Sequence, residues 1–254
     1  MLKVDTRSDP TRFAEAEALY LEVRKAEGRV LSPEALRKLP RVAADDPHAR
    51  EWRCRAATAD RLIRHLRRRK PHPHILDLGC GPGWMTALLA GELEATAVGI
   101  DCNRSELERG AEAFGTVGGL QLVYGDIFEP VVEENSFDAV IVASVLQYFP
   151  DPQMLLKRLL DLVKPNGEVL IADTPFYRRE AIPAAAERTR AYYSELGFPQ
   201  MAEHYHHHSL EDIARFSPEN LYDPNASLIR IARKVLRRPL SPFPILRLCK
   251  SEGS

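Results

Sequence analysis

The chain has 254 residues, of which 44% are apolar and 28% charged, so it can bury a large hydrophobic core and has an ordinary globular composition. Its formal net charge is -1, which excludes a general attraction to nucleic acid or to an anionic membrane. No apolar run approaches the roughly 18 residues of a membrane span, and the first residues lack the basic-then-apolar order of a signal peptide. The four cysteines form no Cys-x-x-Cys pair, which argues against a zinc site or a disulfide framework. We therefore expect a cytoplasmic protein.

The first 47 residues are predicted to form a helical cap. Asp-Pro at 9–10 and Ser-Pro at 32–33 each combine a capping side chain with a proline at the first helical position, which is typical of helix starts. The second of these helices should end before Pro40. A longer helix is expected from about His48 to Arg69, because one face is apolar while many arginines lie elsewhere.

Beyond residue 73, short apolar runs alternate with helical segments, which is typical of a parallel sheet with crossover helices. The expected strands are His74–Leu78, Ala95–Asp101, Leu120–Tyr124, Phe137–Ala143 and Glu168–Asp173. The helices between them are expected at Trp84–Leu93, Ser105–Phe114 and Pro152–Val163.

The part of the chain after residue 175 carries weaker patterns. A helix is expected at Glu180–Leu196, followed by a loop rich in Pro, Gly and His and by a brief helix after Ser209. A terminal hairpin would pair residues 220–222 with 244–249 around a helix at 226–237. With this hairpin, the prediction is an α/β protein with a doubly wound, mostly parallel, seven-stranded sheet.

A glycine-rich turn, Asp-Leu-Gly-Cys-Gly-Pro-Gly at residues 77–83, lies between an apolar strand and a helix. Glycines are needed there because a Cβ would block the turn or the close approach of a ligand. The spacing is Gly-x-Gly-x-Gly, whereas the third glycine of the dinucleotide fingerprint would fall at Trp84. The turn therefore predicts a nucleotide-type cradle and argues against a nicotinamide-dependent dehydrogenase.

Residues 75–83 resemble the first motif of the class I S-adenosylmethionine-dependent methyltransferases, and the resemblance extends from about Arg53 to Phe176. It implies a Rossmann-like methyltransferase domain over residues 48–254, after the cap at 1–47, with a substrate-facing insert near 175–215. The implied cofactor is S-adenosylmethionine, with S-adenosylhomocysteine as its product.

The resemblance also assigns cofactor contacts at the ends of the strands. Asp101 would accept hydrogen bonds from both ribose hydroxyls, and Asp126 would bind the adenine amino group. Cys102 and Ile127 would pack against the adenine. Backbone carbonyls near Ala143 and Ser144 would hold the methionine ammonium, with Asp77 beneath it. The predicted cofactor residues are Asp77, Gly79, Cys80, Gly81, Gly83, Asp101, Cys102, Asp126, Ile127, Ala143 and Ser144. The alternative to these cofactor contacts is a structural role: Asp101 would cap the next turn, and Asp126 would be a turn residue whose side chain bonds its own backbone.

The methyl acceptor is expected to be a small molecule that is methylated on O, N or C without a metal ion. Residues 144–148 read Ser-Val-Leu-Gln-Tyr, which lacks the Asn/Asp-Pro-Pro pattern of enzymes acting on base amines and the aspartate of magnesium-dependent ones. The cap, residues 173–179 and the histidine loop at 204–208 would line the acceptor. The candidate catalytic residues are His206, His207 and Tyr148, because a histidine can deprotonate a hydroxyl near neutral pH. The alternative to these catalytic roles is that the histidine loop is solvated and that Tyr148 only packs under the next helix.

Two other functions stay open. A basic face at residues 50–70, joined by basic residues at 230–238, is the electrostatic footprint of an RNA methyltransferase, although the neutral net charge disfavours it. A regulatory subunit that binds the cofactor without catalysis is disfavoured because Asp77, Asp101 and Asp126 are all present.

Overall fold

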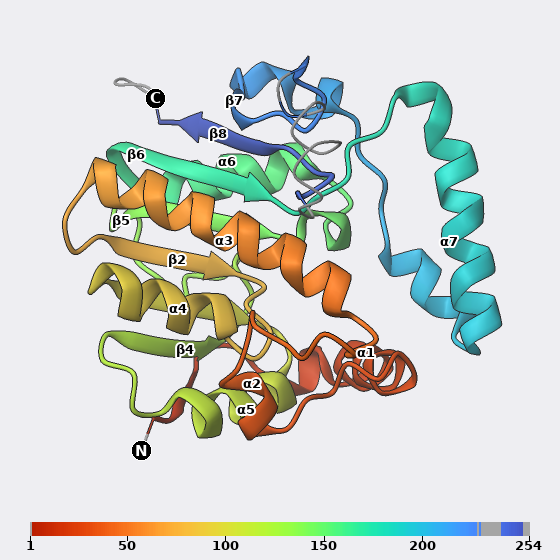
Figure 1. Ribbon diagram of the computed structural model, residues 1–254, viewed down its shortest axis with the longest axis horizontal. Coiled ribbons are helices and arrows are strands. Elements are labelled where there is room, and N and C mark those ends of the chain that lie inside the picture. The colour runs from red at the N-terminus through yellow and green to blue at the C-terminus, as the bar shows by residue number, and fades with distance from the viewer. Residues whose placement is uncertain (1, 228, 230–239, 251–254) are drawn as a thin grey trace.

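The computed structural model describes residues 2–227, 229 and 240–250 (Figure 1). Within them the strands form one eight-stranded sheet with the order β1-β4-β3-β2-β5-β6-β8-β7. Neighbouring strands are parallel from β1 to β6, whereas β8 pairs antiparallel with both β6 and β7. The strands are β1 (Val4–Thr6), β2 (His74–Leu78), β3 (Thr96–Asp101), β4 (Leu120–Tyr124), β5 (Phe137–Ala143), β6 (Val163–Ala172), β7 (Glu219–Tyr222) and β8 (Ile245–Cys249).

The predicted doubly wound, mostly parallel α/β sheet is confirmed. The chain moves outward from β2 through β3 to β4 and then places β5 and β6 on the other side of β2. The order therefore reverses between β2 and β5. In open α/β sheets, ligands bind outside the carboxyl ends of the strands at such a switch point.

The predicted number of seven strands is wrong, because β1 adds an eighth strand from the segment expected to be a helical cap. Val4 pairs with Leu122 and Thr6 pairs with Tyr124, so β1 runs parallel to β4. Without β1, the outer side of β4 would expose unpaired backbone N–H and C=O groups at an edge. Three residues are too few for a periodic pattern, which is why the sequence did not indicate this strand.

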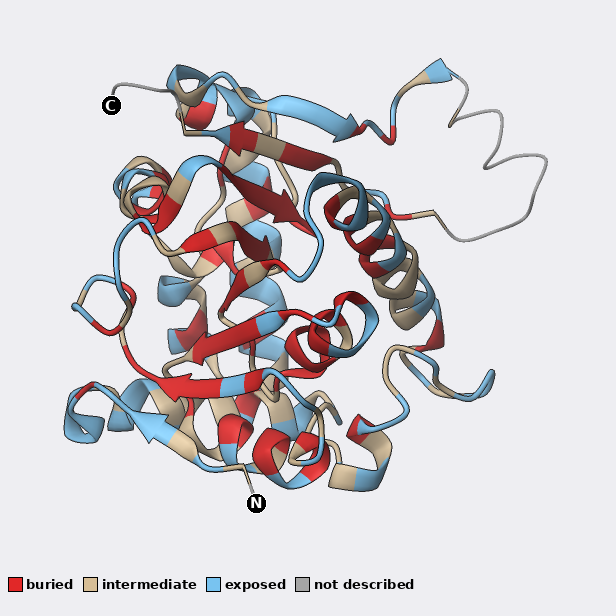
Figure 2. Cartoon of the chain, turned by 90° about the vertical axis from the view of Figure 1, so that its left-hand side faces the viewer, coloured by how far each residue is buried: buried red, intermediate tan, exposed pale blue. Residues whose placement is uncertain are grey.

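Helices cover both faces of the sheet. One core contains Ile75 and the inner sides of α3, α4 and α5, and the other contains Leu76 and α6. Successive residues of a strand point to opposite faces, so β2 supplies both cores. Figure 2 shows the resulting pattern of buried strands with exposed residues on the outer sides of the helices. The helices are α1 (Ala14–Ala26), α2 (Pro33–Leu36), α3 (Ala49–Arg69), α4 (Trp84–Leu93), α5 (Arg104–Phe114), α6 (Pro152–Leu162) and α7 (Ile182–Leu196), with short 3-10 helices η1 (Pro10–Arg12), η2 (Leu146–Tyr148), η3 (Arg179–Ala181), η4 (Pro199–His204) and η5 (Leu210–Phe216).

The expected terminal hairpin is present as β7 and β8, which pair through Glu219 with Arg247 and Asn220 with Leu246. The helix expected at 226–237, with the basic residues at 230–238, lies outside the described residues apart from 226, 227 and 229. In the part of the chain that the structure describes, no helix is both long enough and apolar enough to cross a bilayer.

A roof of α1, α7 and η4 covers the carboxyl ends of the strands, and α7 stands beyond the arrowheads of β2 and β6 in Figure 1. A small apolar cluster joins its parts through Val23 of α1, Tyr193 of α7 and Met201 of η4. Tyr148 of η2, which directly follows β5, packs against the same cluster. The roof is thus attached to the sheet at the switch point.

Candidate functional site

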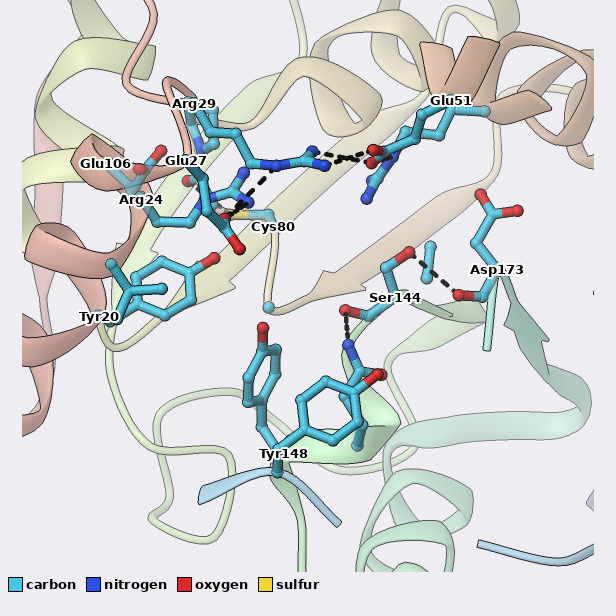
Figure 3. Close-up of a pocket in the computed structure, with 18 of the residues that line it drawn as sticks. Tyr20, Arg24, Glu27, Arg29, Glu51, Cys80, Glu106, Ser144, Tyr148 and Asp173 are labelled. Atoms are coloured by element: carbon cyan, nitrogen blue, oxygen red, sulfur yellow. Dashed lines mark hydrogen bonds and ion pairs between the residues drawn. The ribbon is translucent and has the colours of Figure 1, made fainter. Parts of the chain in front are cut away.

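Two cavities adjoin at the carboxyl edge of the sheet, beneath the roof. The polar cavity, of about 500 Å³, is lined among others by Asp77, Gly81, Gln147, Asp173 and charged residues of α1 and α3 (Figure 3). The apolar cavity, of about 420 Å³, is lined among others by Phe13, Ile100, Asp101, Cys102, Asp126 and Ile127. Gly79, Ser144 and Tyr148 line both cavities, so one extended ligand can occupy the two together.

The three glycines of the turn after β2 have different tasks. All have positive φ, of 63° at Gly79, 54° at Gly81 and 72° at Gly83. A Cβ on Gly79 would lie 2.0 Å from Val145 Cγ2, and one on Gly83 would lie 2.9 Å from Leu122 Cδ2. A Cβ on Gly81 would meet nothing nearer than 3.9 Å, because this residue faces the polar cavity. Gly81 therefore leaves room for a ligand, whereas Gly79 and Gly83 permit the turn to pack; Gly83 lines neither cavity.

Asp101 ends β3 and lines the apolar cavity. Its Oδ2 accepts a hydrogen bond of 2.7 Å from the Gly81 amide, and its Oδ1 accepts one of 2.8 Å from the Asn103 amide. Burial raises the pKa of this carboxyl group to about 6. Each carboxylate oxygen can accept a further hydrogen bond, so the backbone contacts leave capacity for two ligand hydroxyls.

Asp77 lies within β2 and lines the polar cavity with a carboxyl group that is only 3% exposed. Thr86 Oγ1 donates a hydrogen bond of 2.6 Å to its Oδ2. Burial raises the pKa of Asp77 to about 7, and the negative charge of Asp101 adds to this effect. Burial also raises the pKa of the neighbouring Cys80 thiol, which lines the same cavity. A cation bound here would stabilise the ionised Asp77.

The floor of the apolar cavity contains the remaining predicted adenine contacts. Ile127 is 2% exposed, and Cys102 Sγ donates to the Gly125 carbonyl over 3.3 Å. Asp126 Oδ1 accepts a hydrogen bond of 3.0 Å from the Phe128 amide, and its Oδ2 lies 3.4 Å from an Arg12 nitrogen. Asp126 is therefore a turn aspartate that also lines a cavity, so the two interpretations are compatible.

Two predicted residues lie at the end of β5: Ala143 is its last residue, and Ser144, which follows it, lines both cavities. Ala143 and Ser144 line the polar cavity, and Ser144 has a φ of 59°. The Ser144 amide donates to the Ala172 carbonyl over 3.0 Å, and Ser144 Oγ donates to the Asp173 carbonyl over 3.1 Å. The end of β5 is thus held against the end of β6 in a left-handed conformation.

Of the candidate catalytic residues, only Tyr148 reaches the cavities. Its ring lies edge-on to Tyr20 of α1, with centroids 6.0 Å apart, and edge-on to Tyr205, at 6.1 Å. Figure 3 draws Tyr20 and Tyr148 among the residues that line the polar cavity. Burial raises the pKa of Tyr148, so this phenol is neutral at physiological pH.

The structure does not bring His206 and His207 to the site: neither residue lines the polar or the apolar cavity. The backbone amide of His206 donates to the Gln147 carbonyl over 2.7 Å. The Nε2 atom of His207 lies 2.9 Å from Thr189 Oγ1, behind the cavity wall. Burial lowers the pKa of His207. Among the described residues, no three His, Cys, Asp or Glu side chains are grouped to hold a metal ion.

Charged side chains of the cap and of the start of α3 form a wall of the polar cavity that sequence reasoning missed. Arg24 lies 3.2 Å from Glu27, while Glu51 accepts bonds from Arg29 at 2.5 Å and Arg55 at 2.9 Å (Figure 3). Burial opposes ionisation of Glu51, but the hydrogen bond from Arg29 and the charge of Arg55 outweigh it and lower its pKa to about 2. Of these arginines, only Arg55 belongs to the basic face expected at residues 50–70. The pair of Arg29 with Glu51 joins residues 22 positions apart, which the sequence pattern does not indicate.

Three buried acceptor atoms in the polar cavity have no hydrogen-bond partner among the described residues: Glu106 Oε1, Gln147 Oε1 and Asp173 Oδ2. Glu106 Oε1 lies 2.7 Å from an Arg109 nitrogen in an ion pair, whereas Gln147 and Asp173, both 8% exposed, have none among these residues. The other Asp173 oxygen accepts bonds from Thr58 Oγ1 at 2.8 Å and Ser241 Oγ at 3.3 Å. An unsatisfied buried polar group costs about 1–3 kcal/mol, so such a pair in a cavity marks a place for a ligand.

Part of the chain is similar in sequence to known proteins. A family model described as a methyltransferase domain matches residues 76–171. The demethylmenaquinone methyltransferase of Staphylococcus aureus strain MRSA252 is 36% identical over 101 residues, which cover 39% of this chain and 42% of that protein. The match thus spans less than half the length of this relative.

Solved structures share the fold. The plantazolicin methyltransferase BpumL in complex with SAH is 17% identical with a TM-score of 0.55, over 92% of this chain and 100% of that one. The YcgJ protein of Bacillus subtilis is 16% identical with a TM-score of 0.54, over 75% of this chain and 98% of that one. Residues 76–171 are therefore similar to a methyltransferase domain, and the chain shares the fold of these solved structures.

Proposed function

We propose that this chain transfers a methyl group from S-adenosylmethionine to a small molecule by in-line displacement, without a metal ion. The observation that carries the proposal is the open cradle at Gly81, flanked by the buried carboxylate of Asp77 and the partly buried carboxylate of Asp101, beside a second cavity. The cofactor would supply an electrophilic methyl group on a sulfonium. The protein then has mainly to align the acceptor and exclude water.

The residues present fit the cofactor. The apolar cavity suits a planar adenine between Ile127 and Cys102, with Asp126 at its edge. Asp101 has two oxygens available for ribose hydroxyls, and Asp77 supplies a buried negative charge for the methionine ammonium. Gly79, Gly81 and Gly83 shape the turn, and Cys80, Ala143 and Ser144 line the cavity where the methionine end would lie.

The acceptor would occupy the rest of the polar cavity, beneath the cap at 1–47 and the insert near 175–215 of the domain at 48–254. Tyr148 lies at the junction of the two cavities and is our candidate for contact with the reacting atoms. His206 contacts Gln147 through its backbone amide and His207 contacts Thr189 through its ring, so neither is retained as our catalytic candidate. The named acceptors of the relatives, demethylmenaquinone and plantazolicin, support a small or medium-sized molecule rather than RNA.

The test is methyl transfer from isotopically labelled S-adenosylmethionine to a fractionated metabolite extract, read by mass spectrometry. We expect labelled product and S-adenosylhomocysteine in equal amounts with the wild type, and at least a hundredfold less with Asp101→Ala. Asp5→Asn is the matched control, because Asp5 is exposed on β1 and lines neither cavity. Equal labelling by wild type and Asp101→Ala would contradict the proposal.

A further inference from the structure

Asp173 is a buried carboxylate of the polar cavity that the proposed cofactor contacts leave unused. It directly follows β6 and is 8% exposed. Its Oδ1 accepts hydrogen bonds from Thr58 Oγ1 at 2.8 Å and from Ser241 Oγ at 3.3 Å. Its Oδ2 is buried and has no hydrogen-bond partner among the described residues. The protein therefore holds one oxygen in place, while the other remains available to a ligand of the cavity.

The backbone of Asp173 lies beside the junction of the two cavities. Ser144 lines both cavities, and its Oγ donates to the Asp173 carbonyl over 3.1 Å (Figure 3). Both residues have a left-handed backbone, with φ of 59° at Ser144 and 48° at Asp173. Residues other than glycine in such strained conformations are concentrated at functional sites. Asp173 thus contacts a residue at the place where the proposed cofactor and acceptor sites meet.

The other groups of the cavity that could accept a proton are occupied or neutral. Each of the four other carboxylates has a partner: Glu27 pairs with Arg24, Glu51 with Arg29, Asp77 with Thr86 and Glu106 with Arg109. Burial raises the pKa of the Tyr148 phenol, so it keeps its proton. In the described part of the chain, Asp173 Oδ2 is the buried carboxylate oxygen of this cavity that has neither a hydrogen bond nor an ion pair.

Arg55 partly offsets the charge of Asp173. Burial raises the pKa of Asp173, the positive charge of Arg55 lowers it, and the negative charge of Glu51 raises it. Three arginines of the cavity wall share only the two carboxylates of Glu27 and Glu51, which leaves one positive charge to balance Asp173. Arg188, the fourth arginine of the cavity, is exposed on α7. An ammonium ligand would therefore add an unbalanced charge, and an anion would be repelled by Asp173, so a neutral group fits best.

A neutral partner of Asp173 Oδ2 must donate a hydrogen bond, because a carboxylate oxygen only accepts one. Most amines are protonated near neutral pH and are not neutral. The nitrogen of an amide is neutral, but its lone pair is delocalised into the carbonyl group and attacks a methyl group poorly. A hydroxyl group is neutral, donates its hydrogen and keeps lone pairs on oxygen for the attack.

We infer that Asp173 is a catalytic residue, a general base whose Oδ2 takes the proton of a hydroxyl group on the acceptor, so that the product is a methyl ether. The inference rests on the proposed function and names its substrate class. General-base catalysis of this kind contributes about a hundredfold to ten-thousandfold to a rate.

The step balances in protons and electrons. A lone pair of the hydroxyl oxygen forms the O–C bond to the methyl group of S-adenosylmethionine while the C–S bond breaks, and the electrons of that bond remain on sulfur as a neutral thioether. The hydroxyl proton passes to Asp173 Oδ2. Thr58 and Ser241 hold the other oxygen, so the carboxyl group keeps its position when it is protonated. Asp173 returns the proton to water when the methyl ether leaves.

The atom that receives the methyl group can be identified before the acceptor is known. The wild type is incubated with S-adenosylmethionine labelled with carbon-13 in its methyl group and with a fractionated metabolite extract. Proton–carbon correlation spectra then distinguish a methyl group on oxygen from one on nitrogen or carbon by its chemical shift. We expect a methyl ether. A methyl group on nitrogen or carbon would overturn the inference and leave the proposed function intact, whereas no labelled product would overturn both.

Asp173→Asn tests the role of the carboxylate in the same assay at saturating cofactor. The amide oxygen can keep the bonds from Thr58 and Ser241, but the base is lost. We expect unchanged binding of S-adenosylhomocysteine by calorimetry and a rate lowered by about a hundredfold or more at neutral pH. The deficit should shrink towards alkaline pH, because the acceptor hydroxyl then ionises without the base.

The matched control is Asp5→Asn, which should keep the wild-type rate and pH profile because Asp5 is exposed and lines neither cavity. An Asp173→Asn variant with the wild-type rate, or with a deficit that is the same at every pH, would overturn the inference. Loss of S-adenosylhomocysteine binding in Asp173→Asn would also overturn it, since the residue would then have a structural role.

Discussion

The sheet edge at residues 74–148 and the roof of α1, α7 and η4 build the same site by different physical means. At the sheet edge, each group is positioned by a neighbour close in sequence, such as Asn103 and Asp101, or by the regular register of parallel strands. In the roof, the contacts join distant segments, as when Tyr20 of α1 meets Tyr148. Under the proposed function, the edge would hold the cofactor and the roof would select the acceptor.

The sharpest way to break this comparison is a pair of glycine substitutions at the sheet edge. Gly79→Ala would place a Cβ 2.0 Å from Val145 and should lower the free energy of unfolding by about 3 kcal/mol. Gly81→Ala meets open space and should cost only about 1 kcal/mol, yet its methyl group enters the cradle and should weaken cofactor binding at least a hundredfold. Denaturant unfolding and calorimetry measure the two effects. Equal losses of stability in the two variants would contradict a packing role for Gly79 and a ligand-binding role for Gly81.

A smaller effect is expected from pH, because the edge holds two buried carboxyl groups with pKa values of about 7 at Asp77 and about 6 at Asp101. The cationic cofactor binds the ionised forms, so its affinity should fall as the pH drops through 7, by up to about tenfold per pH unit. The folded apoprotein takes up these protons more readily than the unfolded chain does. Its stability should therefore decrease as the pH rises from about 4 to 7.

Asp77→Asn serves as the check on this pH dependence. The variant should bind the cofactor more weakly at pH 8 and should lose most of the change in affinity between pH 6 and 8. Calorimetry at several pH values gives both results. An unchanged pH profile would show that Asp77 does not face the cofactor.

The smallest effect is predicted for the histidines of the roof. His207 contacts Thr189 behind the cavity wall, so His207→Ala should lower activity by less than about fivefold and stability by about 1 kcal/mol. Steady-state kinetics on the acceptor identified by labelling would measure the change. If His207→Ala lost more than a hundredfold of its activity while still binding the cofactor, His207 would again be a candidate general base.

Sequence reasoning succeeded where structure is local. The bounds of β2, α4, β4 and β5 match the predicted ranges, because apolar runs, glycines and capping signals lie within each segment. It missed β1, a strand of three residues that is defined by its pairing with β4, far along the chain. It also missed the unpaired oxygens of Gln147 and Asp173, since a residue 115 positions away, Thr58, orients Asp173. His206 and His207 were predicted to be catalytic because a histidine can accept a proton near neutral pH. Their position in the fold depends on long-range packing, which the sequence does not indicate.

The central claim is that Asp77, Gly81 and Asp101 hold S-adenosylmethionine at the switch point. Isothermal titration of wild type, Asp101→Ala and Asp5→Asn with S-adenosylmethionine tests it most directly. We predict one site per chain, an affinity at least tenfold weaker for Asp101→Ala because two charge-assisted hydrogen bonds are lost, and no change for Asp5→Asn. Absence of binding by the wild type, or equal binding by Asp101→Ala, would contradict the account.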